Sequence, residues 1–148
     1  MTTWLCDTNV WLALALPEHL HHAVCVKWFG ELPDGDSLRF CRSTQQSFLR
    51  LLTNFPAVGA PDRPPLTNRQ AWRAFDELLD DTRISLQADE PAGVEPAWVE
   101  FATRDTASPK LWADAYLAAF AKAGGHTMVT TDRAFHQFAG LDLLVLGG

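Results

Sequence analysis

Short apolar runs alternate with amphipathic stretches along the first part of this chain. The run at 4–6 ends at Asp7, and apolar positions then continue to Leu16, so a strand that leads into a helix is predicted. A second helix is predicted over 23–29, because apolar residues there recur at helical spacing before Gly30. Together these elements form a strand followed by two helices.

The next segment predicts a second strand and another helix. The strand is expected over 38–42, and Thr44 is the expected N-cap of the helix that follows it. The apolar face of that helix is formed by Phe48, Leu49, Leu51 and Leu52. The proline-rich segment 55–67 is then a predicted loop, and its length makes it the expected mobile element.

The second half of the chain continues the alternation of helices and strands. Helices are predicted over 68–81, 95–104 and 111–124, and strands over 83–86, 128–130 and 143–146. In the first of these helices the residues expected to face inward are Trp72, Phe75, Leu78 and Leu79. Strands separated by helices predict an α/β fold whose parallel sheet is flanked by helices, in a single domain over 1–148. Ligands of such sheets bind at the carboxyl ends of the strands.

The composition is typical of a globular protein and argues against a membrane role. Of the 148 residues, 47% are hydrophobic and 20% are charged. No apolar stretch approaches the ~20 residues that span a bilayer. The first residues lack the features of a secretory signal, so a cytoplasmic location is expected. Cys6, Cys25 and Cys41 have neither disulfide nor metal spacing and are expected to be buried.

Three aspartates stand where the predicted elements could bring them together. Asp7 follows the first strand, Asp132 follows the strand at 128–130, and Asp114 lies among apolar residues early in the helix at 111–124. Each alone is also explained as a cap or turn residue. Together they indicate one site, because a carboxylate among apolar side chains needs a cation or hydrogen-bond donors. Four polar residues flank these aspartates and are expected either to orient them by hydrogen bonds or to act as ordinary caps. They are Thr8, Asn9, Thr130 and Thr131.

Clustered carboxylates without histidine or cysteine partners favour Mg²⁺ or Mn²⁺ over zinc. Such an ion can polarise a phosphodiester oxygen and activate water, so phosphodiester hydrolysis is predicted. The net charge of −6 argues against a general nucleic-acid binder, but a bound cation would reverse the local field. A solvated loop or helix start, rather than a metal site, is expected for His19, His21 and His22. The core or a dimer interface is expected for Trp11, Trp28, Trp72 and Trp112.

Three motifs resemble those of the PIN-domain family. The sequence DTNVWL at 7–12 resembles the opening motif of the family, ADAYLA at 113–118 its second acidic helix, and TTDRAF at 130–135 its third motif. The resemblance covers essentially the whole chain and implies a three-layer α/β/α fold. For a chain of this length it implies a VapC-type toxin of a type II toxin–antitoxin pair. Such a toxin is an Mg²⁺-dependent endoribonuclease, usually a homodimer, and is inhibited by a VapB-type antitoxin.

One position departs from the family pattern. Many members carry a glutamate at the start of the helix after the second strand, where this chain has Gln45. The amide oxygen of Gln45 could ligate a cation but adds no charge, so its role as a ligand is left open. A catalytically inactive PIN fold that only binds a partner is left open for the same reason. Contacts to RNA phosphates, or structural salt bridges, are expected of Arg42, Arg50 and Arg133.

Two other enzyme classes place an aspartate after a strand of an α/β sheet. An aspartyl-phosphate phosphatase of the haloacid-dehalogenase kind needs a second acid two residues later, where this chain has Asn9. A receiver domain needs paired acids after its first strand. The sequence disfavours both.

The antitoxin is expected to bring a cationic segment to the acidic pocket, which suits the negative net charge.

Overall fold

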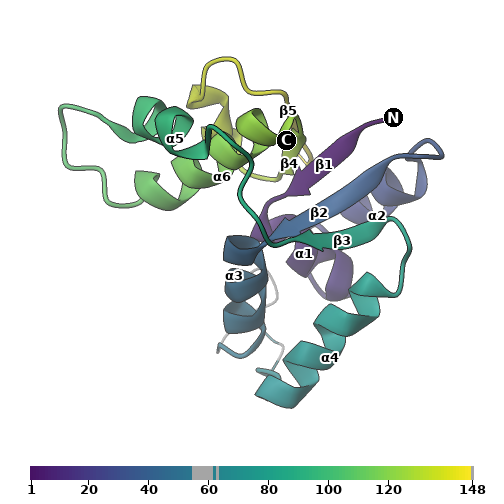
Figure 1. Ribbon diagram of the computed structural model, residues 1–148. Helices are drawn as coiled ribbons and strands as arrows, with labels where there is room; N and C mark the ends of the chain where they lie inside the picture. The colour runs from purple at the N-terminus through teal and green to yellow at the C-terminus, as the bar shows by residue number, and fades with distance from the viewer. Residues whose placement is uncertain (55–61, 63, 148) are drawn as a thin grey trace.

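Five parallel strands form the centre of the computed structural model, which describes residues 1–54, 62 and 64–147 (Figure 1). In chain order the elements are β1 (Thr3–Cys6), α1 (Thr8–Ala15), α2 (His22–Gly30), β2 (Ser37–Cys41), α3 (Arg42–Leu52), α4 (Asn68–Leu79), β3 (Ile84–Gln87), α5 (Val94–Ala102), α6 (Leu111–Gly124), β4 (Thr127–Thr130), the 3₁₀ helix η1 (Arg133–Gln137) and β5 (Leu143–Val145). The strand order is β3-β2-β1-β4-β5, and every neighbouring pair is parallel. The predicted α/β fold is therefore confirmed.

Helices cover both faces of the sheet, and each face has its own hydrophobic core. Leu5 and Cys6 are adjacent on β1, and because side chains alternate along a strand they point into different cores. The first core lies under α1 to α4, where Trp11 stacks on Phe40 with ring centroids 3.8 Å apart. The second lies under α5 and α6 and contains Phe120. The three-layer α/β/α arrangement expected from the resemblance is thus present (Figure 1).

The strand order reverses its direction between β1 and β4. From β1 the chain moves outward to β2 and β3, and it then returns to the other side of β1 to form β4 and β5. Ligands of open parallel sheets bind at such a reversal, outside the carboxyl ends of the strands. Asp7 follows β1 and Asp132 lies just beyond β4, so both aspartates stand at this reversal.

The start of α3 differs from the prediction. The helix begins at Arg42 with Cys41 as its N-cap, so the prediction that Thr44 is the N-cap is wrong. Thr44 is the third helical residue, and its hydroxyl oxygen accepts a hydrogen bond from the backbone N–H of Cys41 at 3.0 Å. The same hydroxyl donates to the carbonyl oxygen of Cys41 at 3.0 Å. Thr44 therefore stabilises the helix start from inside the helix.

Two of the four tryptophans lie outside the core. Trp72 is 50% exposed, so the prediction that it faces inward is wrong, and Trp112 is 54% exposed, so of its two predicted places only a dimer interface stays open. On α4 the buried arc runs through Ala71 and Phe75, and Trp72 lies at its edge. Trp11 is fully buried as expected, and Trp28 is half-buried against Trp4.

The histidine segment is less solvated than predicted. His19 is only 7% exposed, and its Nδ1 accepts a hydrogen bond from the backbone N–H of His21 at 3.0 Å. His22 begins α2, and its Nδ1 donates to the carbonyl oxygen of Ala13 at 2.7 Å. The expectation of a solvated loop is therefore wrong for His19, whose ring helps to close the turn before α2.

Two further predictions concern the cysteines and the long loop. Cys6, Cys25 and Cys41 are free and buried, as expected. Most of the loop at 55–67, which is expected to be mobile, lies outside the described residues. Within the described part of the chain, no helix is both long and apolar enough to cross a membrane.

Candidate active site

Asp7 is held rigidly at the junction of β1 and α1. Its backbone N–H donates to the carbonyl oxygen of Val129 on β4 at 2.9 Å, and its side chain is 9% exposed. One carboxylate oxygen accepts from the backbone N–H of Thr8 at 2.8 Å, and the other accepts from the hydroxyl of Thr130 at 2.8 Å. Each oxygen of this buried carboxylate is thus fixed by one donor.

The hydroxyl of Thr130 connects Asp7 to the loop that carries Asp132. While it donates to Asp7, its oxygen accepts from the backbone N–H of Asp132 at 3.0 Å. The carboxylate of Asp132 is exposed and caps η1 by accepting from the N–H of Ala134 at 2.9 Å. Of the four predicted orienting residues, Thr130 does so through its side chain and Thr8 through its backbone. In the described residues, no hydrogen bond joins Asn9 or Thr131 to these aspartates.

Asp114 brings the third carboxylate from the first turn of α6. It is half-buried, and its pKa is raised from the usual 3.8 to about 6. The main cause is burial, and the negative charges of Asp7 and Asp132 add to it. Burial also raises the pKa of Asp7 against the opposing hydrogen bonds, with a further contribution from Asp132. Because the charge of Asp132 acts on both Asp7 and Asp114, the three aspartates, from three separate elements, lie in one locality.

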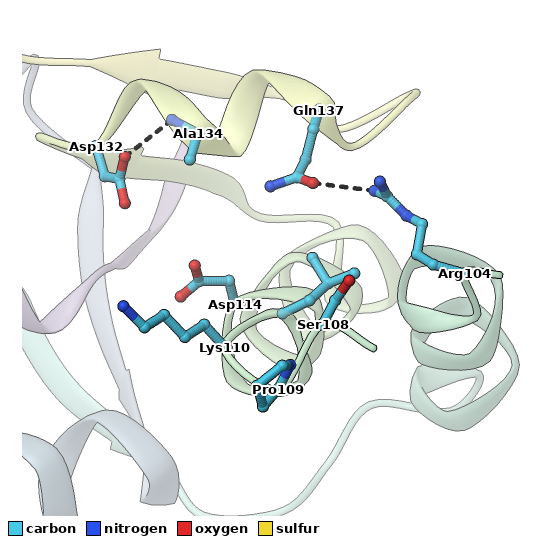
Figure 2. A pocket seen from close by; sticks show the side chains of 9 residues that line it. Arg104, Ser108, Pro109, Lys110, Asp114, Asp132, Ala134 and Gln137 are labelled. Carbon is cyan, nitrogen blue, oxygen red and sulfur yellow. Dashed lines mark hydrogen bonds between the residues drawn. The ribbon is translucent and has the colours of Figure 1, made fainter. Parts of the chain in front are cut away.

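Asp114 and Asp132 line an open pocket of about 570 Å³. In Figure 2 their carboxylates point to one end of this pocket, and the ammonium of Lys110 reaches the same end. Arg104 lies at the other end, where its Nη2 donates to Oε1 of Gln137 at 3.0 Å. The pocket therefore combines two carboxylates with two cationic side chains.

Sequence reasoning missed both cations of this pocket. Lys110 stands four residues before Asp114, and this spacing places both on one side of a helix, so the signal was present. Arg104 had no such local signal, because the chain turn at 103–110 brings it to the pocket.

The carboxylates fit a hard cation in their chemistry, although they do not form a closed cage. Among the described residues, no three His, Cys, Asp or Glu side chains stand close enough to hold an ion. However, Mg²⁺ bonds directly to only one or two carboxylates and keeps several waters, so it does not require such a cage. Within the described chain, the half-buried carboxylate of Asp114 has neither a hydrogen bond nor an ion pair. A cation in the pocket would compensate this charge.

The unpaired charge of Asp114 predicts an effect on stability. Its folded-state pKa is raised, so the stability it contributes is full at low pH and is lost as pH rises from 3.8 to about 6. Without divalent ions, Asp114→Asn should therefore increase the free energy of unfolding at neutral pH, by about 1 kcal/mol after solvent screening. The gain should vanish below pH 4. Urea titrations at several pH values would measure it, with the exposed Asp89→Asn as control, and equal curves for both variants would contradict the burial argument.

Gln45 is buried near the start of α3 with its oxygen already engaged. It is 4% exposed, and its Oε1 accepts from Nη1 of Arg42 at 2.7 Å. Arg42 itself is exposed beside the end of β2. Arg133 follows Asp132 directly, whereas Arg50 lies on α3 against a different cavity, together with Trp72. Arg50 is therefore less well placed than Arg133 to reach a substrate at the aspartates.

Comparisons with known proteins match this arrangement over nearly the whole chain. The family model of the PIN domain matches residues 4–141. Ribonuclease VapC41 of Mycobacterium tuberculosis is 54% identical over 142 residues, which cover 96% of this chain and 97% of that protein. Such an identity over nearly the whole of both chains shows that they belong to one family, not only that they share a fold.

Solved structures of lower identity share the fold. One is a structure of VapBC2 from Rickettsia felis bound to a DNA fragment from the VapBC2 promoter. It aligns with a TM-score of 0.69 at 14% identity, covering 98% of this chain and 99% of that chain. VapC20 of Mycobacterium tuberculosis, a toxin that cleaves the sarcin-ricin loop, aligns with a TM-score of 0.64 at 19% identity, covering 93% and 95%. The family model and the 54% identical relative confirm the resemblance to the PIN-domain family. The chain belongs to the PIN-domain family and is a VapC-type member of it.

Proposed function

We propose that this chain is a metal-dependent endoribonuclease that hydrolyses RNA phosphodiester bonds, as the toxin of a VapBC-like type II toxin–antitoxin pair. The observation that carries the proposal is the gathering of Asp7, Asp114 and Asp132 at the carboxyl ends of β1 and β4. The 54% identity to Ribonuclease VapC41 supports RNA as the substrate. A VapB-type antitoxin and a second copy of this chain are the proposed protein partners.

Mg²⁺ or Mn²⁺ would bind at the three aspartates, directly to one or two of the carboxylates and through its retained waters to the rest. The bound ion would supply Lewis-acid polarisation of the phosphodiester and activation of a water. Thr130 keeps the carboxylate of Asp7 oriented, and Asp132 is fixed to the same hydroxyl through its backbone. Asp114 presents its carboxylate to the open pocket, where the phosphate group would bind.

Gln45 is better explained as a partner of Arg42 than as a ligand. Ligation of an ion through its oxygen would require Arg42 to give up a hydrogen bond of 2.7 Å. We therefore assign Gln45 to positioning Arg42, whose guanidinium keeps further donors for a phosphate. A purely binding PIN fold is less well supported, because a scaffold gains nothing from burying the carboxylates of Asp7 and Asp114 close to a third one, where burial and repulsion raise the pKa of both.

Cleavage of total cellular RNA by the purified chain tests the proposed function. With Mg²⁺ or Mn²⁺ we expect discrete fragments, and EDTA should abolish them because the carboxylates alone cannot polarise a phosphate. Mn²⁺ binding should be measured calorimetrically on the same protein. Binding without cleavage of any cellular RNA would favour the inactive scaffold, and the absence of both would refute the metal site.

A further inference from the structure

The acidic pocket adjoins a second cavity around the loop at 103–110. The second cavity has a volume of about 400 Å³, and Arg104, Ser108 and Pro109 form walls of both. Beyond these shared walls it reaches Thr103, Thr106 and Trp112. We call the two cavities together the loop groove. Each has a volume typical of a ligand site.

The loop groove bends around the start of α6. Trp112 and Asp114 are two positions apart, so they point to nearly opposite sides of this helix. The groove therefore leads from the carboxylates, past the loop, to an exposed tryptophan. A ligand that fills it must be elongated and must change direction at the loop.

Cations line the acidic pocket of the groove, with Lys110 beside the carboxylates and Arg104 at the other end. Lys110 is exposed and, within the described chain, has no hydrogen bond or ion pair. Arg104 uses one of its donors on Gln137, and a guanidinium carries five. The positive end of the α6 dipole lies at the same place. In a chain with a net charge of −6, these groups form a local site for a polyanion.

Trp112 is exposed, but contacts with Trp98 restrict its rotation. The residue is 54% exposed, although its ring packs against Trp98 at a centroid distance of 6.1 Å and an interplanar angle of 81°. Nε1 of Trp98 also donates to the carbonyl oxygen of Trp112 at 2.9 Å. A supported, exposed aromatic ring next to cations is the combination that binds single-stranded nucleic acids, because bases stack on the ring while the cations hold the backbone.

We propose that the loop groove binds single-stranded RNA on one side of the scissile phosphate, with Arg104 and Lys110 on neighbouring phosphates and a base stacked on Trp112. This inference rests on the proposed function, because the carboxylates at one end of the groove define where the scissile phosphate lies. It gives the enzyme a preference for unpaired RNA, since both faces of a base inside a duplex are already stacked on its neighbours.

Anisotropy of a short, fluorescein-labelled single-stranded RNA of mixed sequence measures this binding. The Asp7→Asn background with Mg²⁺ present keeps the RNA intact. Trp112→Ala should raise the Kd about tenfold. Trp112→Phe should retain most of the affinity, because stacking needs only an aromatic face. Trp72→Ala is the matched control, since Trp72 is 50% exposed but lies outside the groove, and it should leave the Kd unchanged.

Salt dependence tests the two cations separately. Lys110→Gln and Arg104→Gln should each lower the slope of log Kd against log salt by about one, as expected for one lost phosphate contact. Lys27→Gln, which changes an exposed lysine on α2, should not.

Several outcomes would overturn the inference. If Trp112→Ala and Trp72→Ala bind RNA equally well while the wild type cleaves RNA, RNA binding in the loop groove is refuted and the proposed function is not. If Trp112→Ala binds RNA normally but escapes inhibition by the antitoxin, the groove is a protein-docking site instead. A wild type that neither binds nor cleaves RNA would refute the proposed function together with the groove.

Discussion

Asp114→Asn is expected to reduce metal-dependent RNA cleavage by about a thousandfold or more in kcat/KM. The substitution keeps the shape of the side chain but removes the charge that faces the pocket, and a bound cation supplies several kcal/mol of transition-state stabilisation. Asp7→Asn should have a loss of similar size, because its buried carboxylate belongs to the same group of charges. Cleavage rates with saturating Mn²⁺ would measure both.

Three controls separate loss of the ion from loss of the fold. Asp89→Asn, outside the pocket, should cleave as the wild type does. Asp114→Asn should be more stable than the wild type in EDTA because it removes an unpaired, half-buried charge, so lost activity would accompany increased stability. The double variant Asp7→Asn with Asp114→Asn should lose little more activity than either single variant, since groups that hold one ion act as a unit. Full cleavage by purified Asp114→Asn would refute the proposed site.

The position of the aspartates could be predicted because the signals are local. The apolar run before Asp7 predicts a strand that ends there, and the structure has this strand as β1. The run before Asp132 likewise predicts β4. The alternation of strands and helices then requires a parallel sheet, and a parallel sheet gathers its carboxyl ends at one edge. Local pattern and topology together were sufficient for the fold and for the place of the carboxylates.

Features that depend on packing between distant segments could not be predicted. Whether Trp72 faces the core depends on how α4 is rotated against the sheet, and its apolar character alone suggested burial. The contact of Arg104 with Gln137 joins two segments that no sequence pattern connects. The role of Thr130 was only one of four equal possibilities in the sequence, because flanking hydroxyl and amide groups are chemically alike until a hydrogen bond selects one.

Thr130→Val is expected to weaken metal binding and RNA cleavage by about 10- to 100-fold, the usual effect of losing a partner that orients a metal-binding group. Valine has nearly the same shape but cannot donate to the carboxylate of Asp7 or accept from the N–H of Asp132. Both acidic segments would lose the hydroxyl that connects them, while all three carboxylates remain. Thr130→Ser keeps the hydroxyl and should retain most of the activity.

The decisive measurement is Mn²⁺ affinity by calorimetry, at a temperature where circular dichroism shows both variants folded. A valine that acted only through stability would leave this affinity unchanged in the folded protein. Thr127→Val at the start of β4 is the matched control, because Thr127 lies at the opposite end of the strand from the aspartates. If Thr130→Val bound Mn²⁺ and cleaved RNA like Thr127→Val, the hydroxyl would have no part in orienting Asp7, and the backbone N–H of Thr8 alone would be sufficient to hold it.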